Sequence, residues 1–276
     1  PNQEIYEEMV NDILKSRNDA KKEKSAILQG AMKNYALYGD ASPFKDIFSE
    51  QELKSIKAEQ LTQKVKELNT FKHRFFYYGP ASLQSVIDEL HAKHARSFAP
   101  KEYPVKKEYT YRAMDKNEVY FVDYDMLQSE ILFIQKSTPF SLDLIPYANI
   151  HNQYFGGGIS SIIFQEIRES KALAYSARNT FSVPSDAKEW CFNTTYIGTQ
   201  VDKLPDAVAA MNGLLSEMPQ SSKQFEDAKT SALKQISTDR ITKKSIFYNF
   251  ETAKKMGIDY DYRKDSYLKI KTLTMA

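Results

Sequence analysis

Apolar residues recur at helical spacing along the first third of the chain. Within residues 2–16, Ile5, Met9 and Ile13 stand four positions apart, which places them on one face of a helix. Ser49 precedes Glu52 at the spacing of a capping box, which is typical of a helix start. The short aromatic run HRFFYYG (73–79) favours a strand instead. The pattern predicts helices over residues 2–16, 23–37, 49–56, 61–68 and 81–94.

The pattern changes over residues 97–118. This stretch contains Pro100 and Pro104, alternating charges and no helical stripe of apolar residues. Such a composition is typical of an extended linker or an edge strand. We therefore predict a linker over residues 101–118 that separates residues 1–100 from residues 119–276.

The second part of the chain contains segments with the apolar spacing of a helix and segments with the pattern of a strand. Strands are predicted at VYFVDY (119–124), SEILFIQK (129–136), LAYSARNTFSV (173–183) and EWCFNTTYI (189–197), and PSDAK (184–188) has the composition of a hairpin loop. Helices are predicted over residues 142–155, 161–170, 204–218, 222–240 and 245–256. Because short turns join neighbouring strands, we predict an α+β fold with an antiparallel sheet and helices packed on one face.

Composition narrows the class of protein. Apolar residues make up 42% and charged residues 27%, and the formal net charge is +2, which is typical of a globular protein with a real core. No basic block stands out, so nucleic acid is a poor candidate partner. No apolar run approaches the roughly 20 residues that span a bilayer. The single cysteine, Cys191, cannot form an internal disulfide, so cysteine use does not indicate the compartment.

The three consecutive glycines, Gly156, Gly157 and Gly158, do not form a nucleotide-binding motif. No lysine follows them as in a P-loop, and a predicted helix rather than a strand precedes them. A turn between two helices explains them better, because glycine is favoured just past a helix end. Glycine also lets a backbone approach closely, so a peptide ligand lying against this turn stays possible.

The histidines give no metal motif. His91 and His94 can share a helix face, but the chain contains neither H-E-x-x-H nor H-x-x-E-H. Lys93 between them would oppose a cation, and a zinc site needs further ligands. Two surface histidines near a helix end are the better interpretation, and no metal site is predicted within this chain. Cys191, in a predicted strand, is interpreted as a core or sheet-face residue because no base is positioned beside it.

Arg168 and Tyr175 are the remaining candidates for chemistry. Arg168 falls near the end of the helix predicted over 161–170, and Tyr175 falls at the start of the next strand. A corner of that length can bring both side chains to one edge of a sheet. From the residues alone, an arginine that caps or pairs at the helix end and a tyrosine packed on the sheet are the better interpretation, since both are common.

The stretch from Tyr154 to Tyr175 resembles the pitrilysin/insulinase-type (inverzincin) zinc metallopeptidases, a family that includes mitochondrial processing peptidase. The resemblance is to the C-terminal, non-zinc-binding portion. It extends through most of residues 119–240 and, less closely, over residues 1–95. The positions that carry it are Tyr154, Phe155, Gly156, Gly157, Gly158, Ser160, Ser161, Phe164, Glu166, Arg168, Glu169, Leu173, Ala174 and Tyr175.

The resemblance implies LuxS/MPP-like domains. Residues 1–100 would be the rear part of a preceding peptidase-like domain, and residues 119–276 the front part of a near-complete C-terminal one. Two halves of such an enzyme close around a peptide or protein substrate, and an N-terminal half of the same protein binds zinc. The positions matching the family's substrate-binding arginine and tyrosine are Arg168 and Tyr175, where a guanidinium would hold a peptide carbonyl and a phenol would support the oxyanion. The turn Gly156–Gly158 would lie by the peptide path.

The absence of H-x-x-E-H from these residues implies that this segment is inactive alone and that zinc would be held upstream in a longer protein. The resemblance also fits a non-catalytic scaffold or partner subunit of the same fold. A free-standing peptide-binding module is less favoured, because a half-domain would leave strand edges unpaired. A bacterial periplasmic or cell-envelope setting is our expectation, and the sequence itself does not identify the compartment.

Overall fold

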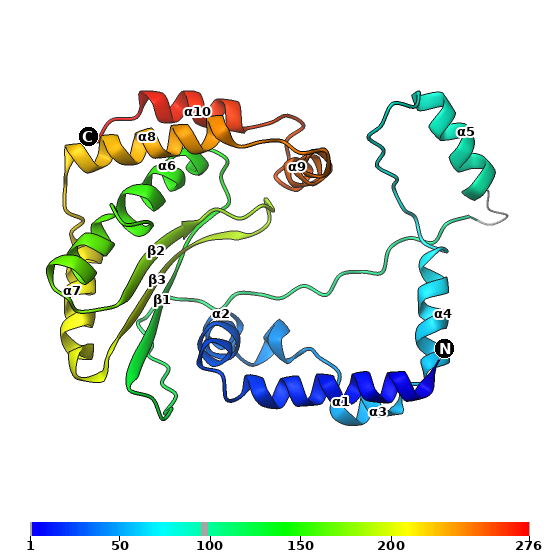
Figure 1. The fold of residues 1–276 in the computed structure, drawn as a ribbon, viewed down its shortest axis with the longest axis horizontal. Coiled ribbons are helices and arrows are strands. Elements are labelled where there is room, and N and C mark those ends of the chain that lie inside the picture. The colour runs from blue at the N-terminus through cyan, green and yellow to red at the C-terminus, as the bar shows by residue number, and fades with distance from the viewer. Residues whose placement is uncertain (1, 95–98, 276) are drawn as a thin grey trace. The chain divides into compact units, whose positions relative to one another are not determined.

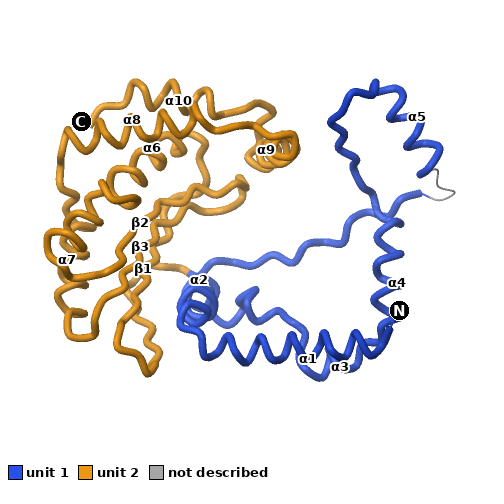
Figure 2. Tube along the Cα trace, viewed as in Figure 1, with its two compact units in different colours: residues 1–112 blue, residues 113–276 orange. Residues whose placement is uncertain are grey.

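The computed structural model describes residues 2–94 and 99–275, and the chain divides into two compact units, residues 1–112 and 113–276 (Figure 2). The division falls within the stretch predicted as a linker, 101–118. The interpretation of the two units as the rear and front parts of successive peptidase-like domains stays a prediction.

Unit 1 is helical. Its elements are α1 (Gln3–Ala20), a π-helical segment Ala26–Met32 that continues into α2 (Lys33–Tyr38), two short 3-10 turns (Gly39–Ala41 and Pro43–Lys45), α3 (Glu50–Ser55), α4 (Ala58–Leu68) and α5 (Leu83–His94) (Figure 1). The capping box predicted from Ser49 and Glu52 is confirmed at the start of α3. Tyr6 of α1 is buried and donates a 2.6 Å hydrogen bond to the carbonyl oxygen of Leu53, which ties α1 to α3.

Two predicted strands are wrong. Residues 73–79 and 119–124 have extended or irregular backbone without sheet pairing among the described residues. Among the described residues of unit 1, the pairing is reduced to an isolated parallel bridge between Phe71 and Lys101. The physical reason is that a strand exists only through hydrogen bonds to a neighbouring strand, and neither segment has one here. Their β-forming side chains are exposed instead, as for Phe121 at 83%.

Unit 2 contains an antiparallel sheet. Its strands are β1 (Gln128–Pro139), β2 (Ser176–Ser182) and β3 (Trp190–Gln200), in the order β1-β3-β2. The predicted strands at 129–136, 173–183 and 189–197 are confirmed in kind, and β2 pairs with β3 as the hairpin composition indicated. β1 pairs with the other edge of β3, so the central strand is the last of the three in sequence.

One face of the sheet is buried under helices. Ile197 of β3 is fully buried and is paired with Ile131 of β1 and Ala177 of β2. These side chains pack with apolar residues of the helical segments in one core. Helices α6, α8 and α10 lie on this same side of the sheet (Figure 1). The predicted α+β class, with helices on one face of an antiparallel sheet, is therefore confirmed.

The helical elements of unit 2 agree with most of the predicted ranges. They are α6 (Leu144–His151) with a π-helical continuation Asn152–Gly156, the π-helical segment Phe164–Ser170, a 3-10 turn Val201–Lys203, α7 (Leu204–Ser216), α8 (Ser222–Thr238), α9 (Lys243–Lys255) and α10 (Arg263–Thr272). The sequence pattern did not predict α10. Its Ile270 is nevertheless fully buried in the core of unit 2.

Candidate functional site

Arg168 and Tyr175 lie at the two ends of a tight corner. Arg168 is in the last turn of the π-helical segment Phe164–Ser170, which is anchored by the fully buried Ile167. Ala172 adopts a left-handed backbone conformation with φ of 49°, and this residue reverses the chain. The Tyr175 amide then donates to the Gly198 carbonyl oxygen at 3.2 Å, which starts the pairing with β3 just before β2 begins.

Tyr175 is exposed but held in place. Its residue exposure is 42%, and its hydroxyl donates a 2.8 Å hydrogen bond to Oε1 of Gln128, the first residue of β1. Its ring crosses β3 at Gly198, where a Cβ would come within 2.9 Å of the Tyr175 hydroxyl. Glycine at this position therefore makes room for the ring, and the phenol reaches from the start of β2 to the opposite edge of the sheet.

Arg168 is exposed and weakly held. Its Nε atom lies 3.6 Å from Oε1 of Glu169, and its Cζ atom lies 4.8 Å from the ring centre of Phe164. Ion pairs and cation–π contacts at exposed positions contribute only about 0–1 kcal/mol each. The guanidinium can therefore exchange these partners for a ligand at small cost. The two candidate side chains have separate partners, and both are reached by solvent.

The three glycines differ in what they do. Gly156 is buried, and a Cβ there would lie 1.9 Å from the backbone oxygen of Asn179 in β2. At Gly157 a Cβ would meet the Asn152 oxygen at 3.0 Å. Gly158 is exposed, has a φ of +82° and has open space around it. Close packing thus requires the first glycine, and a left-handed turn favours the third.

Two asparagines attach the glycine turn to the sheet, and the sequence pattern did not single them out. The amide of Asn152 donates to the carbonyl oxygen of Phe181 at 3.0 Å and accepts from its N–H at 2.8 Å. This pair of bonds copies the contact of a neighbouring strand at the edge of β2. Asparagine is common in turns and loops, so nothing in the sequence alone distinguishes this role.

Asn179 is the centre of a buried polar network. Its side chain, 1% exposed as a residue, donates to Asn193 Oδ1 and Thr195 Oγ1, both at 2.7 Å. Its Oδ1 lies 2.8 Å from Nε2 of His151, so the imidazole donates from Nε2. Burial lowers the pKa of His151, and the bond to Asn179 opposes this only in part. The network joins α6 to β2 and β3 behind the glycine turn.

The residues that the structure describes do not fit a zinc site. Across residues 2–94 and 99–275, the His, Cys, Asp and Glu side chains form no group of three or more that could hold a metal ion. Cys191 is fully buried, and burial raises the pKa of its thiol, which agrees with its interpretation as a core residue. Among the described residues, the helices lack the combined length and hydropathy that crossing a bilayer requires.

The family of the chain follows from its sequence and fold together. Residues 72–232 match the family described as the peptidase M16 inactive domain, which is more than half of the chain. The chain therefore belongs to this family. The match confirms the resemblance to the non-zinc-binding portion of pitrilysin-type peptidases. A search of curated proteins gives no significant match.

Solved structures share the fold. A peptidase M16 inactive domain from Pseudomonas fluorescens has a TM-score of 0.69 and 15% identity, covering 99% of this chain and 65% of that one. The ferredoxin protease FusC, in complex with Arabidopsis ferredoxin, has a TM-score of 0.72 and 11% identity, covering 96% of this chain and 30% of that one. The periplasmic protease PqqL from Escherichia coli has a TM-score of 0.68 and 14% identity, covering 99% and 30%. This chain thus spans about two thirds of the first structure and under a third of the other two.

Proposed function

We propose that this chain is the part of an M16-type zinc endopeptidase that closes over a peptide and supplies Arg168 and Tyr175 to the substrate. Membership of the peptidase family supports the class of reaction. The observation that carries the proposal is Tyr175, a residue exposed to solvent whose hydroxyl is fixed by Gln128, at the same corner as the exposed Arg168.

The two side chains have the chemistry that peptide hydrolysis needs. A guanidinium offers donors in a fixed geometry, which suits a peptide carbonyl. A phenol hydroxyl can donate to the oxyanion that forms when the scissile carbonyl is attacked, and one such donor is worth about 10²–10³ in kcat. In this role the hydroxyl would transfer its hydrogen bond from Gln128 to the oxyanion, while Gly198 leaves the space over β3 that the ring occupies.

The glycine turn has a smaller part in the proposal. Gly158 is exposed, so its main chain is the portion of Gly156–Gly158 that a peptide could contact. Gly156 is buried against β2 and would act by holding the turn close to the strand. We assign substrate contact to Gly158 and a supporting role to Gly156 and Gly157, which pack against Asn179 and Asn152.

The rest of the enzyme would lie outside this chain. Zinc and its ligands would come from an N-terminal half of the same protein, since the described residues do not fit a metal, and no step is assigned to the metal here. A protein substrate is supported by the ferredoxin bound to FusC. A periplasmic setting is supported by the structural similarity to PqqL, which is a periplasmic protease.

The test uses the whole protein that contains this chain. Arg168→Ala and Tyr175→Phe should each lower kcat/KM for a quenched fluorescent peptide by about 10²–10³, with melting temperatures nearly unchanged because both side chains are exposed. Arg240→Ala and Tyr248→Phe are matched controls at other exposed positions and should leave turnover as it is. Full activity of the Arg168 and Tyr175 variants would exclude the proposal.

A non-catalytic scaffold or partner subunit is the second candidate, and the description of the family as an inactive domain favours it. For a scaffold, Arg168→Ala would leave turnover unaffected. Any effect of the substitution would then be on the stability of the protein or on its assembly with the catalytic subunit. Measuring turnover and melting temperature on the same variants separates the two functions.

A further inference from the structure

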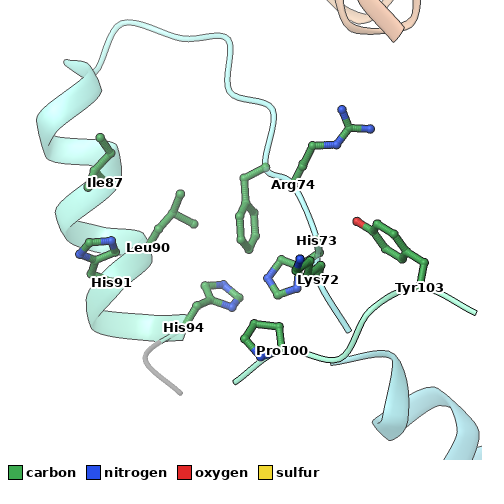
Figure 3. Close-up of a pocket in the computed structure, with 10 residues that line it drawn as sticks. Lys72, His73, Arg74, Ile87, Leu90, His91, His94, Pro100 and Tyr103 are labelled. Carbon is green, nitrogen blue, oxygen red and sulfur yellow. The ribbon is translucent and has the colours of Figure 1, made fainter. Parts of the chain in front are cut away.

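A cavity of about 620 Å³ lies within unit 1, and the proposed function does not use the residues that line it. It opens between α5 and the extended segment 72–75 (Figure 3). Its volume falls in the range of small-ligand sites, about 300–1,000 Å³. The lining residues are Lys72, His73, Arg74, Phe75, Ile87, Leu90, His91, His94, Pro100 and Tyr103.

The base of the cavity is fixed by backbone pairing. The amide of Lys72 donates to the Lys101 carbonyl oxygen at 2.9 Å, and the amide of Lys101 donates to the Thr70 oxygen at 2.8 Å. These bonds hold the segment that begins at Lys72 beside the segment that contains Pro100. α5 then supplies the opposite wall.

One side of the cavity is apolar and aromatic. Leu90 and Ile87 project from α5 (Figure 3). The Phe75 ring lies 4.8 Å from the His94 ring and 4.8 Å from the His73 ring, measured between ring centres. The rings of His73 and His94 are 6.2 Å apart. Two imidazoles thus lie next to the apolar wall.

The two charged side chains of the lining, Lys72 and Arg74, are both cationic. Lysine, arginine and three histidines line the cavity, and no aspartate or glutamate is among the lining residues. Glu102 pairs with Lys72 from outside the lining, and Glu89 pairs with Lys93 on the exposed surface of α5. The cavity therefore favours a negatively charged group close to an apolar one.

We propose that this cavity binds the carboxy-terminal residue of a peptide. A terminal residue carries an apolar side chain and a carboxylate on the same Cα, which matches an apolar wall beside imidazole and ammonium donors. The carboxylate would lie at His73, His94 and Lys72, and the side chain against Leu90 and Ile87. The choice of a peptide over another apolar acid rests on the proposed function.

The experiment measures binding to this chain without cleavage. A fluorescently labelled pentapeptide ending in leucine with a free carboxylate is titrated by anisotropy, beside the same peptide ending in an amide. The acid should bind at least about tenfold more tightly, since a charged hydrogen bond is lost with the amide. His94→Gln should weaken binding of the acid severalfold and leave the amide unchanged. His94 is exposed, so this variant should fold.

A control variant distinguishes binding in the cavity from attraction by the overall charge of α5. Lys93→Gln removes a cation from the same turn of α5 outside the lining and should change affinity less than twofold. Equal binding of acid and amide, or an equal loss in K93Q and H94Q, would overturn the proposal. Dodecanoate that displaces the peptide and binds far more tightly would reassign the cavity to a lipid-like acid. These results do not depend on Arg168 or Tyr175, so the two proposals can fail separately.

Discussion

The ring of Tyr175 lies over Gly198, where a Cβ would come within 2.9 Å of the Tyr175 hydroxyl and 3.0 Å of Cζ. The nearest atoms belong to the far end of a side chain, which can move without breaking the sheet. Gly198→Ala should therefore displace the phenol and break its bond to Gln128, with little change in the free energy of unfolding. We expect a loss of turnover in the whole protein approaching that of Tyr175→Phe.

The crystal structure and turnover of G198A together check this prediction. An alanine accommodated with the Tyr175–Gln128 bond intact would contradict it. Full turnover with a displaced ring would instead argue against a role for Tyr175 in the reaction.

Gly156 should tolerate no side chain. A Cβ there would overlap the backbone oxygen of Asn179 at 1.9 Å, and backbone on both sides leaves little freedom to relax. We expect Gly156→Ala to destabilise unit 2 by more than about 2 kcal/mol, measured by urea denaturation.

Gly213, in the last turn of α7, is the matched control. A Cβ there would meet nothing within 4 Å, and alanine is the better helix former. Gly213→Ala should stabilise the protein by about 0.5–1 kcal/mol. Equal effects of the two substitutions would contradict the packing argument.

The buried side chain of Asn179 should be costly to remove. Asn179→Ala deletes its bonds to His151, Asn193 and Thr195 and leaves those groups without a partner in the core. We expect a loss of about 2–4 kcal/mol in the free energy of unfolding. Thr180→Ala changes the exposed neighbour of Asn179 on the same strand. It should change the free energy of unfolding by no more than about 0.5 kcal/mol.

Stability should depend on pH through His151. Burial lowers its pKa in the folded protein, so as pH falls the unfolded chain takes up this proton first, near the ordinary histidine value of about 6.5. Stability is therefore fully present above that value and decreases below it, by at most about 1.4 kcal/mol per pH unit for one proton. Urea denaturation between pH 7.5 and 5.5 should show this slope, and His151→Gln should flatten it. An unchanged slope in H151Q would assign the dependence to other groups.

The helices with a regular apolar period and good caps could be predicted from the sequence. The box of Ser49 and Glu52 starts α3 where the pattern places it, and β2 and β3 pair across the predicted hairpin loop. α10 was missed because its residues are mostly charged or polar, and its burial depends on Ile270 reaching a core built by other elements.

The strands at 73–79 and 119–124 show the opposite error. Their β-branched and aromatic residues favour extended backbone, but a strand is completed by a partner that local sequence cannot specify. The sequence pattern therefore predicted the preference of these segments for extended backbone but not whether they pair with another strand.

The sequence by itself determined the family, the helical periods and the two polar side chains at the corner, because each is recorded in residue type and spacing. Only the tertiary structure showed that Gly198 makes room for the Tyr175 ring, that Gln128 holds its hydroxyl, that Asn152 bonds to Phe181 of β2, and that Asn179 of β2 bonds to His151. These relations join residues far apart in the chain. They depend on the strand register and on helix packing, which local preferences do not encode.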